Sequence, residues 1–149
     1  MVYRIRAAEA KDLYGIEELE QQCFSFPHTF SQLESELGDP LYTLLVAETE
    51  EKILGYAGLM HVEDEGYITN IAVQKDARRK GIAQALLSSF DELAEELKLA
   101  FISLEVRSGN LPAIRLYEKN GYQRQSVLRD YYSSPREDGL VMTKYRQLQ

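Results

Sequence analysis

The spacing of apolar residues along the chain predicts alternating strands and helices. Leu13, Ile16 and Leu19 recur at helical intervals and predict a first helix over residues 10–23. A wider apolar stripe, with acidic residues on its opposite side, predicts a long helix over residues 83–97. Runs rich in β-branched and aromatic residues predict strands at 2–6, 42–48, 53–62, 66–73, 99–106, 122–129 and 140–146.

Capping and turn residues complete this pattern. Pro27 interrupts helical structure, and Ser31 is expected to cap a short helix that ends at Leu37. Asn110 is expected to cap a further helix, which ends before Asn120-Gly121. The resulting order, β-α-α-β-β-β-α-β-α-β-β, predicts a single domain over residues 1–149. Its expected fold class is α/β (α+β), with helices on both faces of a mixed sheet.

Charge and composition narrow the class of protein. The 149 residues carry a formal net charge of -7, which disfavours direct binding to nucleic acid. No apolar run approaches the ~20 residues needed to cross a membrane, so no membrane partner is expected. Cys23 is the only cysteine, which excludes an internal disulfide and agrees with a cytoplasmic location. The acidic balance suits a cationic partner, such as an amine or a basic peptide, although solubility alone explains it equally well.

The most informative segment is the basic loop between the strand that ends at Val73 and the long helix. Arg78-Arg79-Lys80-Gly81-Ile82-Ala83 stands where the helix is expected to open. The first backbone N–H groups of a helix lack internal partners and, with the helix dipole, favour an anion. Gly81 would let the backbone approach that anion closely. This is chemistry for a pyrophosphate, whereas a solvated basic loop before an ordinary helix is the simpler alternative for this motif alone.

Two runs, TNIAVQKDARRKGIAQALL and SLEVRSGNLPAIRLYEKNGY, resemble the GNAT superfamily of acetyl-CoA-dependent N-acetyltransferases. The resemblance implies a mostly antiparallel mixed sheet that is splayed between its fourth and fifth strands, with acetyl-CoA lying in the gap. It also implies a set of cofactor-binding residues along the strand, the turn and the helices that follow. These are Ile71, Ala72, Val73, Arg78, Arg79, Lys80, Gly81, Ile82, Ala83, Gln84 and Asn110.

Four segments carry a more specific resemblance, to the ribosomal-protein-alanine N-acetyltransferases. They are Phe26-Pro27, NIAV at 70–73, LEVRSGN with LYEKNGY at 104–122, and RDYY…EDGLVM at 129–142. This resemblance implies that the acceptor is the N-terminal α-amine of alanine on a basic ribosomal protein. The family often carries Trp-Ser after the Phe-Pro pair, where this chain has His28-Thr29.

Two residues are candidates for the chemistry of acetyl transfer. Glu105 lies between apolar neighbours in a predicted strand, so its carboxylate needs a partner or a role. The resemblance implies that Glu105 is the general base and that Tyr117 is the acid that protonates the leaving thiolate. The alternatives are an ion pair of Glu105 with Arg107 or Arg115, and a core position for Tyr117.

The remaining candidates concern the acceptor and the reaction route. Phe26, Pro27 and His28, together with Tyr131-Tyr132 in the polar loop between the last two strands, are expected to line the acceptor channel. Cys23 is far from the cofactor motif in sequence and lies in an apolar stripe, so direct attack by the amine is favoured over a covalent intermediate. No metal site is expected, because His28 and His61 are the only histidines and lack companion ligands.

Three functions therefore remain open. The first is acetylation of a ribosomal protein N-terminus. The second is acetylation of a small-molecule amine or a protein lysine. The third is a non-catalytic acyl-CoA-binding module, which would be expected to lack Glu105 or Tyr117, whereas both are present.

Overall fold

A computed structural model describes residues 2–146 and contains one seven-stranded sheet with the strand order β1-β2-β3-β4-β5-β7-β6. The strands are β1 (Arg4–Ala7), β2 (Tyr42–Glu48), β3 (Ile53–Val62), β4 (Glu65–Val73), β5 (Phe101–Arg107), β6 (Gln123–Tyr132) and β7 (Glu137–Tyr145). The helices are α1 (Leu13–Cys23), α2 (Phe30–Leu37), α3 (Ile82–Glu96) and α4 (Leu111–Lys119), with short 3-10 turns η1 (Ala10–Asp12) and η2 (Lys75–Ala77). The predicted order of strands and helices is confirmed.

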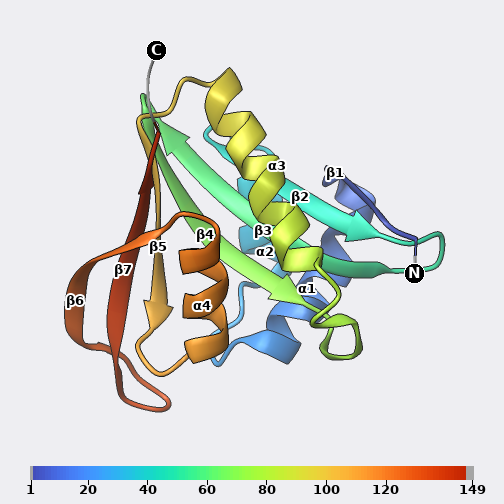
Figure 1. Cartoon of the computed structure of the whole chain (residues 1–149). Helices are drawn as coiled ribbons and strands as arrows, with labels where there is room; N and C mark the ends of the chain where they lie inside the picture. The colour runs from blue at the N-terminus through green and yellow to red at the C-terminus, as the bar shows by residue number, and fades with distance from the viewer. Residues whose placement is uncertain (1, 147–149) are drawn as a thin grey trace.

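The helices lie on both faces of the sheet, as predicted (Figure 1). On one face, α3 and α4 pack through residues such as Leu86, Phe90 and Ile114. On the other face, α1 and α2 pack through Leu19 and Leu33. The sheet therefore separates two apolar clusters. Wherever neighbouring strands are paired, a ligand on one face of the sheet cannot reach the other face. None of the helices within residues 2–146 is both long and apolar enough to cross a bilayer.

Two predicted boundaries were wrong for identifiable reasons. Thr29, not Ser31, caps α2, because its hydroxyl accepts from the Gln32 N–H (3.2 Å) while the Gln32 side chain accepts from the Thr29 N–H (2.8 Å). This reciprocal pair is a capping box. β5 begins at Phe101 rather than residue 99, because the Leu99 N–H bonds to the Ala94 carbonyl and closes the end of α3.

The β6–β7 hairpin is also longer than its sequence suggests. Tyr131 and Tyr132 were predicted in a loop, but they belong to β6, and β7 begins at Glu137. β6 is an edge strand in which nearly every side chain is exposed. Alternation of apolar and polar residues marks a strand that buries one of its faces. A strand such as the end of β6, which buries neither face, lacks this pattern and is not predicted from it.

The sheet opens between β4 and β5, its only parallel neighbours. These strands pair only at residues 65–67 and 101–103, whereas β3 stays paired with β4 as far as Val73 and β7 stays paired with β5 as far as Arg107. In Figure 1 the two strands lie side by side at the top and diverge toward the bottom. The expected splay between strands four and five is therefore present, and it leaves the second half of β4 unpaired on the side that faces β5.

Candidate active site

The start of α3 presents free backbone donors at the open end of β4. Gly81 is the N-cap with φ 83°, in the left-handed region that favours glycine, and no side chain caps the helix. The first four N–H groups, those of residues 81–84, therefore lack helical partners. A Cβ built on Gly81 would meet no atom within 4 Å. The helix begins at Ile82, one residue before the predicted start at residue 83, and the space beside Gly81 is open.

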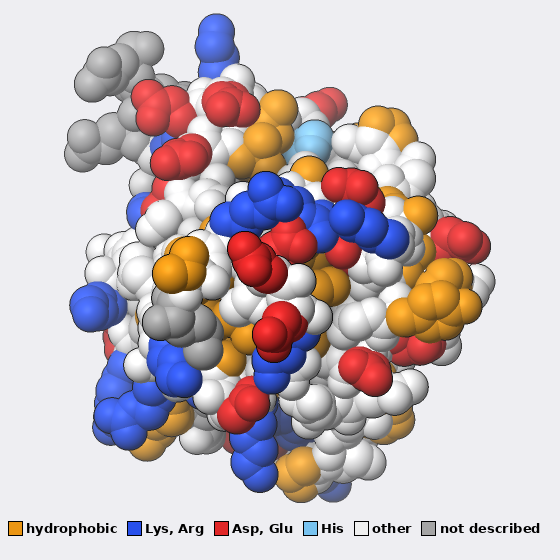
Figure 2. All heavy atoms as spheres, turned by 90° about the vertical axis from the view of Figure 1, so that its right-hand side faces the viewer, with side chains coloured by type: hydrophobic (Ala, Val, Ile, Leu, Met, Phe, Trp, Pro, Cys, Tyr) orange, Lys and Arg blue, Asp and Glu red, His pale blue; other side chains and the backbone are white. Residues whose placement is uncertain are grey.

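The basic residues of the turn directly precede these donors in the chain. Arg78, Arg79 and Lys80 are all exposed, and Arg79 has a positive φ of 63°. The Arg78 guanidinium folds back toward β4, where its Nε donates to the Val73 carbonyl (3.2 Å). Figure 2 shows basic side chains at the lower edge of the face that carries the N-terminus, and acidic and basic side chains interleaved above them. Together the charges and the helix start could bind an anion, and we call residues 78–84 the anion-binding turn.

Cys23 lies beside this turn, although it is distant in sequence. Its Sγ is 3.7 Å from the Val73 carbonyl oxygen and 3.5 Å from an Arg78 guanidinium nitrogen. The separation of Cys23 from the cofactor motif in sequence is therefore not a separation in space. The end of α1 brings the thiol there, because α1 packs against β3 and β4.

Two of the cofactor-binding candidates use their side chains within the protein. The Gln84 amide exchanges two hydrogen bonds with Asn120, at 2.5 and 2.8 Å. The Asn110 side-chain oxygen accepts from the Ala113 N–H (3.3 Å) and caps α4, as predicted. Ile82 is buried in the core, so Gln84 and Ile82 can offer an anion only their backbone N–H groups.

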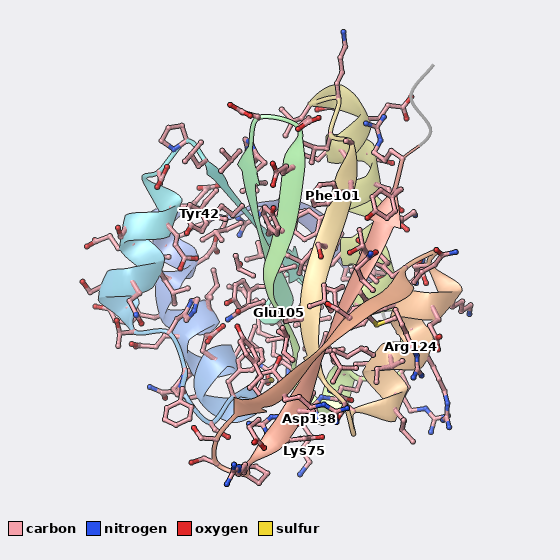
Figure 3. All side chains as sticks on the ribbon, turned by 90° about the vertical axis from the view of Figure 1, so that its left-hand side faces the viewer. Tyr42, Lys75, Phe101, Glu105, Arg124 and Asp138 are labelled. Atoms are coloured by element: carbon pink, nitrogen blue, oxygen red, sulfur yellow. The ribbon has the colours of Figure 1, made fainter. Side chains whose placement is uncertain are left out.

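Glu105 projects from the middle of β5, on the face of the sheet opposite its buried neighbours Leu104 and Val106 (Figure 3). Its side chain is exposed and accepts a hydrogen bond of 2.8 Å from the Tyr131 hydroxyl. Among the described residues, neither Arg107 nor Arg115 forms an ion pair with it, because Arg107 instead pairs with Glu137 (3.2 Å). The alternative reading of Glu105 as one half of an ion pair is therefore wrong.

Tyr117 lies on α4, on the other side of β5 from Glu105. The side chain is half-buried, and its ring lies 6.0 Å from that of Tyr122. Burial raises the pKa of Tyr117 to about 12. The phenol is therefore protonated at neutral pH and can act as a donor.

The aromatic pair Tyr131-Tyr132 stands next to Glu105 and is held by Arg107. The two rings are 5.0 Å apart, and the Arg107 guanidinium lies 4.5 Å above the centre of the Tyr132 ring. Burial, followed by the charge of Glu105, raises the pKa of Tyr132 to about 12. Arg107 also donates to the carbonyls of Ser133 (3.2 Å) and Pro135 (2.8 Å), which fixes the hairpin against β5.

The α1–α2 loop, which carries Phe26, Pro27 and His28, meets this hairpin. The Ser25 hydroxyl donates to the Ser134 carbonyl at 2.9 Å. Phe26 is 69% exposed, Pro27 is exposed and His28 is half-buried. The structure thus brings together the two segments that were predicted to line the acceptor channel.

Sequence reasoning missed one buried carboxylate in this region. Glu20 is fully buried, and its oxygens accept from the His28 N–H (2.8 Å), the Tyr56 hydroxyl and the Asn70 side-chain amide. A signal was available, because Glu20 follows Ile16 by four positions and so falls within the apolar stripe of α1. Within residues 2–146, no three His, Cys, Asp or Glu side chains are arranged so that they could hold a metal ion.

Comparison with known proteins gives this arrangement a family. Residues 13–122 match the model of the acetyltransferase (GNAT) family. A Bacillus subtilis protein provisionally named a ribosomal protein bS18-alanine N-acetyltransferase is 34% identical over 139 residues, which cover 93% of this chain and 92% of that protein. The ribosomal protein bS18-alanine N-acetyltransferase of Escherichia coli K12 is 32% identical over 140 residues, with 93% and 94% covered.

Solved structures agree with the sequence matches. The crystal structure of the ribosomal-protein-S18-alanine N-acetyltransferase from Escherichia coli superposes with a TM-score of 0.91 at 30% identity, and covers 99% of this chain and 96% of that one. The likeness extends over the splayed sheet, the anion-binding turn and the hairpin. The chain belongs to the GNAT family and is an N-acetyltransferase.

Proposed function

We propose that this protein transfers the acetyl group of acetyl-CoA to the N-terminal α-amine of alanine on a basic ribosomal protein. The observation that carries the proposal is that the anion-binding turn and Glu105 both lie at the gap between β4 and β5. The anion-binding turn reaches the open end of β4 beside α3. Glu105 and the hairpin reach β5 from the opposite face. A donor and an acceptor could therefore meet between the two strands.

Acetyl-CoA would lie along the gap with its pyrophosphate on the N–H groups of residues 81–84. Arg78, Arg79 and Lys80 supply positive charge around that position. The pantetheine arm would pair with the unpaired side of β4 at residues 71–73, where backbone donors and acceptors lack strand partners. The amide nitrogen of Asn110, whose oxygen caps α4, would hydrogen-bond the arm from β5's side.

The chemistry would then run by direct attack. The lone pair of the neutral amine attacks the thioester carbonyl carbon, and the amine proton passes to Glu105 directly or through water. The carbon–sulfur bond then breaks, and Tyr117 donates its hydroxyl proton toward the leaving sulfur. A thiol has an ordinary pKa near 8.5, so a phenol with a pKa of about 12 helps chiefly by hydrogen-bonding the charge that develops on sulfur.

A single exposed carboxylate such as Glu105 is a sufficient base for an α-amine acceptor. A protein N-terminus has a pKa near 8, against roughly 10.4 for lysine, so it loses its proton with little help at neutral pH. The net charge of -7 favours a basic partner. The acceptor would enter between the α1–α2 loop at residues 26–28 and the pair Tyr131-Tyr132. The names of the relatives support a ribosomal acceptor, which would place the reaction in the cytoplasm.

The test is acetyl-CoA turnover on three amines: an Ala-starting basic hexapeptide, an N-blocked hexapeptide that contains lysine, and spermidine. We expect turnover on the free Ala N-terminus alone. Glu105→Gln should lower kcat by about 10²- to 10⁴-fold without changing acetyl-CoA affinity, because it removes only the base. The control is Glu96→Gln, which removes an equal charge from the exposed end of α3.

Each other outcome has a definite meaning. Turnover on spermidine or on the blocked peptide would replace the proposed acceptor with a small amine or a lysine. Binding of acetyl-CoA with no turnover on any amine would refute catalysis on these acceptor classes. Full activity in Glu105→Gln would refute the base assignment alone.

A further inference from the structure

The buried carboxylate of Glu20 joins the two halves of the proposed site. It lies in the last turn of α1 with no exposed surface. One oxygen accepts from the His28 N–H in the α1–α2 loop (2.8 Å). The other accepts from the Tyr56 hydroxyl on β3 and from the Asn70 amide on β4. A single side chain thus contacts the acceptor loop and the strand that leads to the anion-binding turn.

Asn70, which donates to Glu20, lies at a β-bulge in β4. β4 carries an extra residue there, because Gly58 pairs with Asn70 while the next residue, Leu59, pairs with Ile68. Such a bulge bends its strand and re-aims the side chains beside it. Asn70 directly precedes residues 71–73, the proposed partners of the pantetheine arm. Glu20 therefore contacts β4 at the bend from which its unpaired end departs.

The cost of burying Glu20 argues against a purely structural role. A carboxylate removed from water loses hydration that only good hydrogen bonds offset, and apolar residues commonly stabilise a core equally well. Here all three donors are neutral groups, and they come from three different parts of the chain. An apolar side chain at residue 20 could fill the same space, but it could not bond the loop backbone.

The loop has other attachments besides Glu20. His28 Nδ1 lies 3.3 Å from a Glu36 carboxylate oxygen on α2. The Phe30 N–H donates to the Glu17 carboxylate (2.8 Å), and Ser25 bonds the hairpin at Ser134. Phe26 and Pro27, between these attachments, are exposed. β4, by contrast, is paired with β3 along its length as far as Val73. Loss of Glu20 should therefore loosen the loop more than β4.

We propose that Glu20 is a positioning residue that holds the acceptor loop in register with the cofactor strand. The inference rests on the proposed function, in which residues 26–28 contact the acceptor. Its specific consequence is a split between substrates. Removing the carboxylate should weaken use of the acceptor and leave use of acetyl-CoA nearly unchanged.

The experiment measures KM for both substrates in Glu20→Ala, Glu20→Gln and Glu18→Gln. Glu18 is the control, because it is exposed on the same helix and carries the same charge. Glu20→Ala should raise the acceptor KM about 10-fold and keep the acetyl-CoA KM within about twofold, as expected when a hydrogen bond to a charged group is lost. Glu20→Gln keeps one carbonyl oxygen and should restore most of the acceptor KM. Glu18→Gln should match the wild type.

Hydrogen exchange supplies a readout that does not depend on turnover. Amides of residues 24–30 should exchange faster in Glu20→Ala and partly so in Glu20→Gln, while those of β4 keep their wild-type rates. Unchanged loop exchange, an unchanged acceptor KM, or an equal rise in both KM values would overturn the proposal. If Glu20→Ala does not fold, the smaller changes expected for Glu20→Gln decide the question by the same criteria.

The two proposals fail in different ways. If the wild type acetylates spermidine instead of the peptide, the acceptor proposal fails, and the Glu20 comparison is run with spermidine. If the wild type acetylates the peptide and the Glu20 variants behave like Glu18→Gln, the positioning proposal fails alone.

Discussion

Replacing Gly81 with alanine separates the two properties of the anion-binding turn, its backbone conformation and its open space. Gly81 has a φ of 83°, and a Cβ there would meet no atom within 4 Å. Alanine would therefore clash with nothing in the protein. Its effects would come from the left-handed backbone and from whatever ligand enters the open space.

The expected magnitudes follow from these two terms. An L-residue in the left-handed region costs about 1–2 kcal/mol relative to its preferred conformation. For a chain of this length, 1 kcal/mol lowers Tm by about 2–4 °C. If pyrophosphate approaches the N–H groups beside Gly81, the new Cβ should also disturb at least one charge-assisted hydrogen bond. That loss should raise the Kd for acetyl-CoA by about 10-fold or more.

Two other glycines provide controls. Gly121 also has a positive φ, of 93°, but it follows α4, and its Cβ would meet the Lys144 side chain at 3.2 Å. Gly121→Ala should therefore lower Tm like Gly81→Ala and leave acetyl-CoA affinity unchanged. Gly38 has an ordinary φ of -84° and only van der Waals contacts for a new Cβ, so Gly38→Ala should leave both quantities unchanged or raise Tm slightly.

The assay is thermal unfolding and acetyl-CoA titration calorimetry on the three variants. The reasoning is refuted if Gly81→Ala lowers Tm as expected but binds acetyl-CoA as tightly as the wild type. In that case the turn is strained but does not contact the cofactor. It is also refuted if Gly121→Ala weakens binding equally, because the loss would then follow global stability.

Two predictions concern stability. The Tyr122 hydroxyl is buried and has no hydrogen-bond partner in the described structure, so Tyr122→Phe should raise the free energy of unfolding by about 1 kcal/mol. Tyr56→Phe removes a donor to Glu20 and should lower the free energy of unfolding. A lower Tm for Tyr122→Phe in calorimetry would contradict the first expectation. Hydrogen bonds from Arg6 hold the pKa of Asp12 below its ordinary value and lower that of Glu48 from 4.5 to about 2. Because the unfolded chain binds these protons more readily, the stabilisation is complete above pH 4.5 and is lost as the pH falls toward about 2. Urea unfolding at pH 7, 4.5 and 2.5 should show that the free energy of unfolding falls with pH in the wild type and falls less in Arg6→Gln. An equal fall in both proteins would contradict this reasoning.

The elements of the proposed cofactor half were predictable because they are local in sequence. The strand that ends at Val73, the basic turn and the helix after Gly81 are consecutive, and each has its own signal in residue type or spacing. The predicted helix start at residue 83 differs by one residue from the observed start at Ile82. Arg79 and Gly81 have positive φ values, which keep the backbone before Ile82 out of the helical conformation.

The acceptor half was predicted only as separate pieces. Its segments lie far apart in the chain, since Ser25 and Ser134 are 109 positions from each other. The hydrogen bonds that hold it, from Arg107 to the hairpin and from Glu20 to the loop, depend on tertiary contacts. Residue type alone offered an ion pair of Glu105 with Arg107 or Arg115 as an alternative. Adjacent strand pairing instead brought Glu137 within 3.2 Å of Arg107.

The gap between β4 and β5 explains why these halves meet at all. The strands touch only around Gly66, where an added Cβ would lie 2.8 Å from the Leu99 side chain and 3.3 Å from the Phe101 carbonyl. Beyond that point β4 follows β3 and β5 follows β7, so the two strands diverge with their carboxyl ends unpaired toward each other. A parallel pair requires a crossover, which α3 supplies on one face, while α1 and α2 occupy the other. The carboxyl end of β4 therefore leads into the anion-binding turn, and the half of β5 that is not paired with β4 carries Glu105. The position of the proposed site thus follows from strand register, and we expect the loop and the hairpin on the second face to select its acceptor.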